Sequence, residues 1–212
     1  MSTRSKKLVR YRRKGKGKMT SKKVAHIAMK TALKLSELKT FYHQDTFTNG
    51  NTWDTQVING ISQGDLVSER EGNTVLMQYI NMRYFIQRAD ATNIVRVLVV
   101  QWFPDNVQDP FDMDKVLQNN TSTNYALISS YASKFGGNKF RVLHDRTHFL
   151  TGDKATSNIV KLNLKGFRRK AYYDGSTATT QQNGIYVCMI SDSAAVNHPE
   201  MVYTTSVRFR EP

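Results

Sequence analysis

Hydrophobic and polar residues alternate in much of the chain after residue 40, and this pattern predicts β-strands. The clearest case is residues 160–165, where Val160, Leu162 and Leu164 are separated by polar residues. A period of two places successive side chains on opposite faces of a strand. Together with continuous apolar runs, it gives eight strand candidates: 41–47, 52–58, 75–88, 94–100, 139–150, 160–165, 185–190 and 201–210.

One candidate, residues 94–100, is almost continuously apolar and is interrupted by Arg96. A run of this kind is typical of a strand that is covered on both faces. We expect Leu98 and Val100 to be buried between two sheets. Residues 185–190 have a similar composition.

The connections complete the picture of an all-β domain. Turn-forming pairs such as Asn59-Gly60 separate several candidates. Eight strands with long loops and little helix predict a two-sheet sandwich, and the jelly roll is the best-known eight-stranded form. The stretch between Trp102 and residue 139 is too long for a hairpin, so we expect it to pack on the end of the sandwich or on a neighbouring copy. Its residues 110–117 are first acidic and then apolar, which predicts a short helix.

Residues 20–39 follow a helical period instead. Thr20 or Ser21 can cap the start, and no Pro or Gly interrupts the run. Lysines occupy much of the remaining surface, so the segment is predicted to be a basic amphipathic helix. Three hypotheses for its apolar stripe remain: it packs on the body or on neighbouring subunits, it lies on a membrane surface, or it packs only when the helix is bound to nucleic acid. The apolar positions are Val24, Ile27, Ala28, Leu35 and Leu38, with Met29 and Leu33 alongside.

Charge divides the chain near residue 40. Residues 1–40 carry fourteen Lys or Arg and one acid, a net charge of +13, whereas residues 41–212 carry only +1. A block of like charge repels itself, so we expect residues 4–18 to be disordered when free. Such an arm needs an anionic partner, and the phosphate backbone of a nucleic acid is the commonest one. We therefore divide the chain into a basic N-terminal arm, 1–40, and a β domain, 41–212.

The candidate nucleic-acid-binding residues are cations of this arm and of a second basic cluster in the body. The body cluster follows a predicted strand, and a solvated loop is the alternative for it. The candidates are Arg4, Lys6, Lys7, Arg10, Arg12, Arg13, Lys14, Lys16, Lys18, Lys22, Lys23, Arg168, Arg169 and Lys170. Residues 4–23 also look like a nuclear-localisation patch, although any nucleic-acid arm has the same composition.

Composition excludes several classes of protein. No apolar run approaches the ~18–20 residues of a membrane span, and the N-terminus lacks the apolar core of a secretory signal. Cys188 is the only cysteine, which rules out a disulfide within the chain and a cysteine-based zinc site and fits a reducing compartment. We expect Cys188 to be a small buried side chain.

The sequence also argues against an enzyme. It contains no phosphate-binding loop and no metalloprotease, nucleophile-elbow or zinc-deaminase motif, and we expect neither a cofactor nor a bound metal. On a strand, His144, Arg146 and His148 would share one face. Because the arginine repels a metal ion, we expect a structural or interface role for the two histidines.

Acidic residues in the long connection invite two other hypotheses. Asp109, Asp112 and Asp114 offer the oxygen ligands that calcium prefers, and calcium between subunits is an open alternative. Their position at a helix start is explained by the helix dipole. With Asp105 they also suggest a metal-dependent nuclease, but no second motif or positioned base accompanies them.

Several short stretches, taken in order, resemble a known family. They are ISQG at 61–64, REGNTV at 70–75, RVLVV at 96–100, FRVLHD at 140–145, NGIYV at 183–187 and SDS at 191–193. Behind a basic arm, they resemble the single jelly-roll capsid proteins of small circular single-stranded DNA viruses and, more distantly, the coat proteins of satellite RNA plant viruses. The resemblance covers most of 41–212. The arm departs from many relatives in being mostly Lys rather than Arg.

The resemblance implies a coat protein of a virion. It implies an icosahedral shell of about sixty copies, with the arm inside on single-stranded viral nucleic acid, DNA in preference to RNA. Assembly in the host nucleus, with a nuclear-import receptor as a further partner, is the corresponding expectation. The alternative is a cellular nucleic-acid-binding protein, ribosomal or chromatin-like, with a β domain and a basic tail. That alternative needs stacking or base-reading residues on the body, where the sequence shows no obvious basic face.

Overall fold

A computed structural model of the chain describes residues 20–48, 50–103, 109–119, 123–132, 140–152, 157, 159–194 and 198–211. The chain divides into two compact units, Met1–Leu35 and Ser36–Pro212. The predicted arm cations from Arg4 to Lys18 lie outside the described residues, and so does Asp105.

The described part of the first unit is the helix α1, Ser21–Leu35. It confirms the predicted amphipathic helix, although it ends before residue 39. The carbonyl of Thr20 accepts hydrogen bonds from the backbone N–H groups of Lys23 and Val24, which begins the helix at this point. No helix in the described part of the chain is long and apolar enough to cross a membrane.

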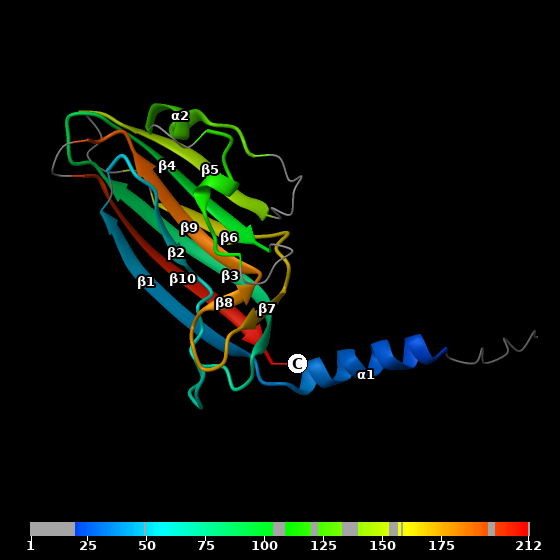
Figure 1. Cartoon of the computed structure of the whole chain (residues 1–212). Coiled ribbons are helices and arrows are strands. Elements are labelled where there is room, and N and C mark those ends of the chain that lie inside the picture. Colours follow the sequence, from blue (N-terminus) through cyan, green and yellow to red (C-terminus); the bar gives the residue numbers. More distant parts are fainter. Residues whose placement is uncertain are drawn as a thin grey trace, which may run out of the picture. The chain divides into compact units, whose positions relative to one another are not determined.

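The second unit contains two β-sheets, whose strands Figure 1 labels. The six-stranded sheet has the order β1 (Lys39–Thr48), β10 (Glu200–Arg210), β3 (Thr74–Gln87), β7 (Lys170–Tyr173) and β8 (Thr180–Gln182), and β6 (Val160–Leu164) also pairs with β3. The four-stranded sheet has the order β2 (Asp54–Val57), β9 (Gly184–Ser191), β4 (Asn93–Trp102) and β5 (Phe140–Leu150). Neighbouring strands are antiparallel in both sheets.

The strand pairs are nested in sequence. The first strand pairs with the last, β2 pairs with β9, β3 pairs with β6 and β7, and β4 pairs with β5. This is the jelly-roll arrangement, an all-β sandwich of two sheets. All eight strand candidates are confirmed, whereas the short strands β7 and β8 were not predicted.

The strand β4 is buried on both faces, as its apolar run predicted, but the expected location of two residues is wrong. Val97 and Val99 face the other sheet in the main core. Leu98 and Val100 are fully buried on the opposite face, where they pack with Val116 and other residues of the long connection. Side chains alternate along a strand, so neighbours in the run cannot all point between the sheets.

The long connection after Trp102 covers the outer face of the four-stranded sheet rather than only the end of the sandwich. The helix predicted at 110–117 is a single 3-10 turn, Met113–Lys115, and the unpredicted helix α2 spans Thr123–Ile128. Cys188 is buried in this outer cluster, as expected of a small apolar side chain, and burial raises the pKa of its thiol.

Candidate nucleic-acid interface

The backbone of the basic cluster 168–170 is held by both sheets. The N–H of Arg168 donates to Oε1 of Gln101 at 2.6 Å, and Nε2 of Gln101 donates back to the carbonyl of Arg168 at 2.9 Å. The carbonyl of Arg169 accepts from the N–H of Met77 at 2.7 Å. Gln101 belongs to β4 and Met77 to β3, so the cluster has a fixed backbone. The cluster is therefore an ordered loop that leads into β7, and its two interpretations, a solvated loop and a second phosphate-contacting patch, both stay predictions.

The side chains of the cluster are exposed to solvent. The guanidinium of Arg168 lies 3.9 Å from the ring centroid of Phe103, and Nζ of Lys170 lies 4.7 Å from that of Tyr172. Cations placed over aromatic rings keep their apolar stems covered while their charged ends face water. Arg168 and Lys170 have no ion pair among the described residues. They are therefore available to an anion.

The two described candidate cations of the arm, Lys22 and Lys23, are exposed in the first turn of α1. That turn contains no acidic residue. The start of a helix has a partial positive charge, which disfavours cations there and favours anions. An anion bound at this turn would relieve the repulsion.

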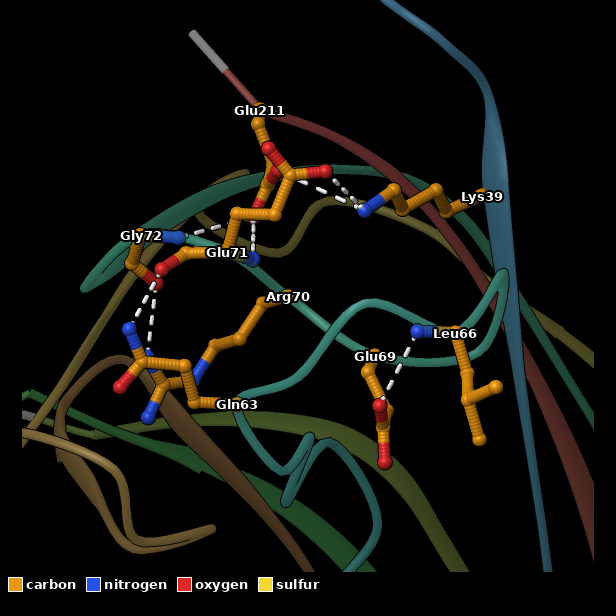
Figure 2. A network of polar contacts seen from close by, with 8 residues as sticks. All are labelled: Lys39, Gln63, Leu66, Glu69, Arg70, Glu71, Gly72 and Glu211. Carbon is orange, nitrogen blue, oxygen red and sulfur yellow. Dashed lines mark hydrogen bonds and ion pairs between the residues drawn. The ribbon is translucent and has the colours of Figure 1, made fainter.

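Lys39, predicted to be part of the arm, lies in the body unit, Ser36–Pro212. Its Nζ is 2.8 Å from Oε1 of Glu71 and 3.7 Å from Oε2 of Glu211, and only 4% of the residue is exposed (Figure 2). The hydrogen bond with Glu71 raises the pKa of Lys39. Because this cation is already paired, it does not add to the charge available for a polyanion.

A buried arginine that sequence reasoning missed organises the loops beside this ion pair. Arg70 is fully buried, and its guanidinium lies 4.4 Å from the ring centroid of Tyr173. Burial lowers its pKa. Figure 2 shows the Arg70 side chain beside Gln63 and pointing toward Gly72. Its five acceptors are the carbonyls of Ile61, Gly72, Gly175 and Thr177, at 2.9, 2.7, 2.5 and 2.7 Å, and Oδ1 of Asn73 at 3.2 Å. The stretches ISQG and REGNTV therefore meet, and both are tied to the turn at 174–177.

A second buried arginine, Arg96, attaches the long connection to the sandwich. Its Nη1 donates to the carbonyls of Ala126 and Ser129, at 2.8 and 3.0 Å. A charged residue in an apolar run needs partners when it is buried. The position of Arg96 in the run of β4 could therefore have predicted this anchoring role.

The two histidines of β5 share one partner. Nε2 of His144 and Nε2 of His148 both lie 3.0 Å from the hydroxyl of Tyr84. A hydroxyl has one proton, so it donates to one imidazole and accepts from the N–H of the other. Burial lowers the pKa of His148 to about 4. The contacts fit the structural role expected from the sequence, and the described residues contain no cluster of three or more metal-ligand side chains.

Two of the aspartates in the connection have partners within the chain. Asp112 caps the 3-10 turn, where its Oδ1 accepts from the N–H of Asp114 at 3.0 Å. Asp109 forms an ion pair with Lys115. Asp112 therefore lies at the start of a helical turn, as predicted, and its side chain caps that turn.

Comparisons with known proteins find similarity to solved structures and no family. No family model matches the chain, and no curated protein matches it. A solved structure titled Desmodium yellow mottle tymovirus contains a similar chain, with 10% sequence identity and a TM-score of 0.41. The similarity covers 84% of this chain and 89% of that one. The jelly-roll assignment rests on the nested strand pairs described above.

Proposed function

We propose that this protein is a viral capsid protein that assembles into a closed icosahedral shell and packages single-stranded nucleic acid on its basic arm. The observation that carries the proposal is the separation of charge on a jelly-roll chain. Residues 1–40 carry +13 and residues 41–212 carry +1. A nearly neutral body can meet copies of itself without strong repulsion, whereas the arms of many copies together form a polycation.

The arm supplies affinity for nucleic acid without selecting a sequence. Each Lys or Arg that contacts a phosphate releases condensed counterions, and this gain does not depend on the base. Packaging of a whole genome needs that property, because every sequence in the genome must be accepted. The same composition is typical of a nuclear-localisation segment. The proposal therefore includes import into the host nucleus, assembly there, and a final location in the virion.

Exposed apolar side chains on the outer face of the four-stranded sheet offer a contact surface for a second copy. Ile128 of α2 is 81% exposed and Phe149 of β5 is 68% exposed. Phe149 is the register partner of Ile94, and Ile94 packs against a cluster that contains Ala126 and Leu127 of α2. The two exposed side chains therefore lie on the same face. Exposed apolar side chains on a shared face are one feature of protein–protein interfaces.

The test is the size and content of the purified full-length protein. Size-exclusion chromatography with light scattering and electron microscopy should show uniform particles much larger than the 24.3 kDa chain. Nucleic acid should be extracted from them after external nuclease treatment, and digestion by DNase or RNase then identifies it. Ile128→Glu with Phe149→Glu should yield folded subunits that do not form particles. A protein that binds nucleic acid but stays monomeric in every condition would instead be a cellular nucleic-acid-binding protein.

A further inference from the structure

The outer face of the six-stranded sheet is open, polar and basic. Alternate residues of β1, β10, β3 and β6 point away from the core, because their neighbours are the buried residues of the sandwich. We call this surface the basic sheet face. Its central members are Tyr42 and Gln44 of β1, Thr204, Ser206 and Arg208 of β10, Tyr79, Asn81 and Arg83 of β3, and Lys161 and Asn163 of β6.

Two cations face each other directly on this surface. Arg83 of β3 is the register partner of Lys161 of β6, and both are exposed. Like charges placed directly opposite each other destabilise a sheet. Neither has an ion pair with any residue that the structure describes. An anion between them would turn this repulsion into attraction.

The positive charge continues along the sheet with little to offset it. Arg208 is the register partner of Tyr79, and Lys170 of β7 is the partner of Leu76 on the same β3 strand. At the outward positions of β1, β10, β3 and β6 that the structure describes, the one acidic residue is Glu200, at the far end of β10. The basic sheet face thus joins the cluster at 168–170 to Arg83 and Lys161.

Two tyrosine rings are exposed among these cations. Tyr42 is 74% exposed and Tyr79 is 56% exposed. They lie two strands and about one side-chain repeat apart, because Tyr42 pairs with Ser206 and Tyr79 pairs with Arg208. With strand spacings of about 4.8 Å and repeats of about 6.8 Å, their positions on the sheet are roughly 12 Å apart. A shallow hollow of about 430 Å³ lies beside Tyr42, between Arg83, Lys161 and Thr204.

We propose that the basic sheet face binds single-stranded nucleic acid, with its cations on phosphates and with Tyr42 and Tyr79 stacked on bases. Exposed aromatics in a positively charged groove are the features that hold single strands without sequence preference. This inference rests on the proposed packaging function and adds to it a surface on the folded body that is separate from the arm. The body is therefore nearly neutral in net charge, but one of its faces is basic.

The charge part of the proposal is tested by salt dependence in the full-length protein. Affinity for a labelled 30-nucleotide single strand is measured across a salt series for Arg83→Gln with Lys161→Gln, and for the matched control Arg141→Gln with Arg146→Gln. Both pairs remove two exposed cations, and the control pair lies on β5 of the other sheet. The face variant should flatten the log–log slope by about 1.4, at about 0.7 per phosphate, and the control should not. Equal slopes in the two variants would overturn the proposal.

The stacking part has its own variants. Tyr42→Ala and Tyr79→Ala should each weaken binding by about tenfold without changing the salt slope, whereas Tyr42→Phe and Tyr79→Phe should stay within about twofold of the parent. Measurement in the background of Arg10→Ala, Arg12→Ala, Arg13→Ala and Lys14→Ala reduces the contribution of the arm. Unchanged affinity in both alanine variants would exclude stacking.

The outcomes separate this inference from the proposed function. Suppose that the particles contain nucleic acid but the sheet-face variant has the same salt slope as its control. The capsid proposal would then stand, and the proposed binding by the basic sheet face would be rejected. If the protein is monomeric and its binding depends on Arg83, Lys161 and the two tyrosines, the proposed binding by the basic sheet face would be supported and the capsid proposal rejected.

Discussion

Arg96 and Asp145 form a two-pronged ion pair between neighbouring strands, with Nε 3.0 Å from Oδ1 and Nη2 2.8 Å from Oδ2. Burial opposes ionisation of Asp145, but hydrogen bonds from Arg96 and Tyr131 outweigh burial and lower its pKa. The same arginine donates to two carbonyls of the long connection. One side chain therefore connects β4, β5 and the segment that covers them.

Replacing this arginine should be among the most damaging single changes. We expect Arg96→Met to lower the free energy of unfolding by about 3–5 kcal/mol, because it leaves a partly buried carboxylate and two carbonyls without their donor. Urea denaturation measures the loss. Arg83→Met, at an exposed arginine on β3, is the control and should change stability by less than about 0.5 kcal/mol. Similar losses in both variants would mean that Arg96 does not anchor the connection.

The outer cluster should be as sensitive as the main core. Leu98→Ala should cost about 2–5 kcal/mol, since Leu98 is fully buried beneath the connection. Hydrogen exchange should then rise in residues 111–119. Val97→Ala removes a smaller side chain on the other face of β4 and should leave exchange in 111–119 close to that of the parent. A Leu98→Ala protein with normal exchange there would contradict the packing described.

The pair of histidines predicts a loss of stability in acid. The pKa of His148 is lowered by burial to about 4, so the unfolded chain binds a proton that the folded chain rejects. The stability contributed by the neutral, buried His148 is therefore intact above the unfolded pKa of about 6.5 and is lost as the pH falls toward 4, by an amount on the order of 2–3 kcal/mol. Urea midpoints between pH 7.5 and 4.5 measure it. His148→Gln should have the flatter profile, and parallel profiles would exclude His148 as the cause.

The arm should act through charge alone. Replacing Arg10, Arg12, Arg13 and Lys14 with Ala should flatten the salt dependence of single-strand binding by up to about three units and reduce the packaged nucleic acid. The free energy of unfolding should not change, because these residues precede the body unit, Ser36–Pro212. An unchanged slope would transfer the binding function to the body.

Alternation predicted the strands because it depends on neighbours in sequence. Val160, Leu162 and Leu164 mark β6 in this way. The strands β7 and β8 are short, four and three residues, and offer too few alternations to be seen. The period also cannot tell which partner covers each face, so Leu98 was expected on the wrong side of β4.

The charged residues show the same limit. Lys39 was counted with the arm because it follows a run of cations, yet its partners Glu71 and Glu211 come from distant parts of the chain. Similarly, Arg83 and Lys161 are each a single polar position in an apolar alternation. Only the register of β3 with β6 places them opposite each other, and for this reason no basic face was evident in the body sequence.

The nested strand order has a consequence for attaching cargo. Lys39 begins β1 and is the register partner of Phe209, near the end of β10, so the chain enters and leaves the sandwich on adjacent strands. A peptide attached at Glu211 would begin close to Lys39, at the start of β1, because the two side chains form an ion pair. In a shell with its arms inside, such a fusion would be delivered to the interior with the genome, and the outer surface would keep its native shape.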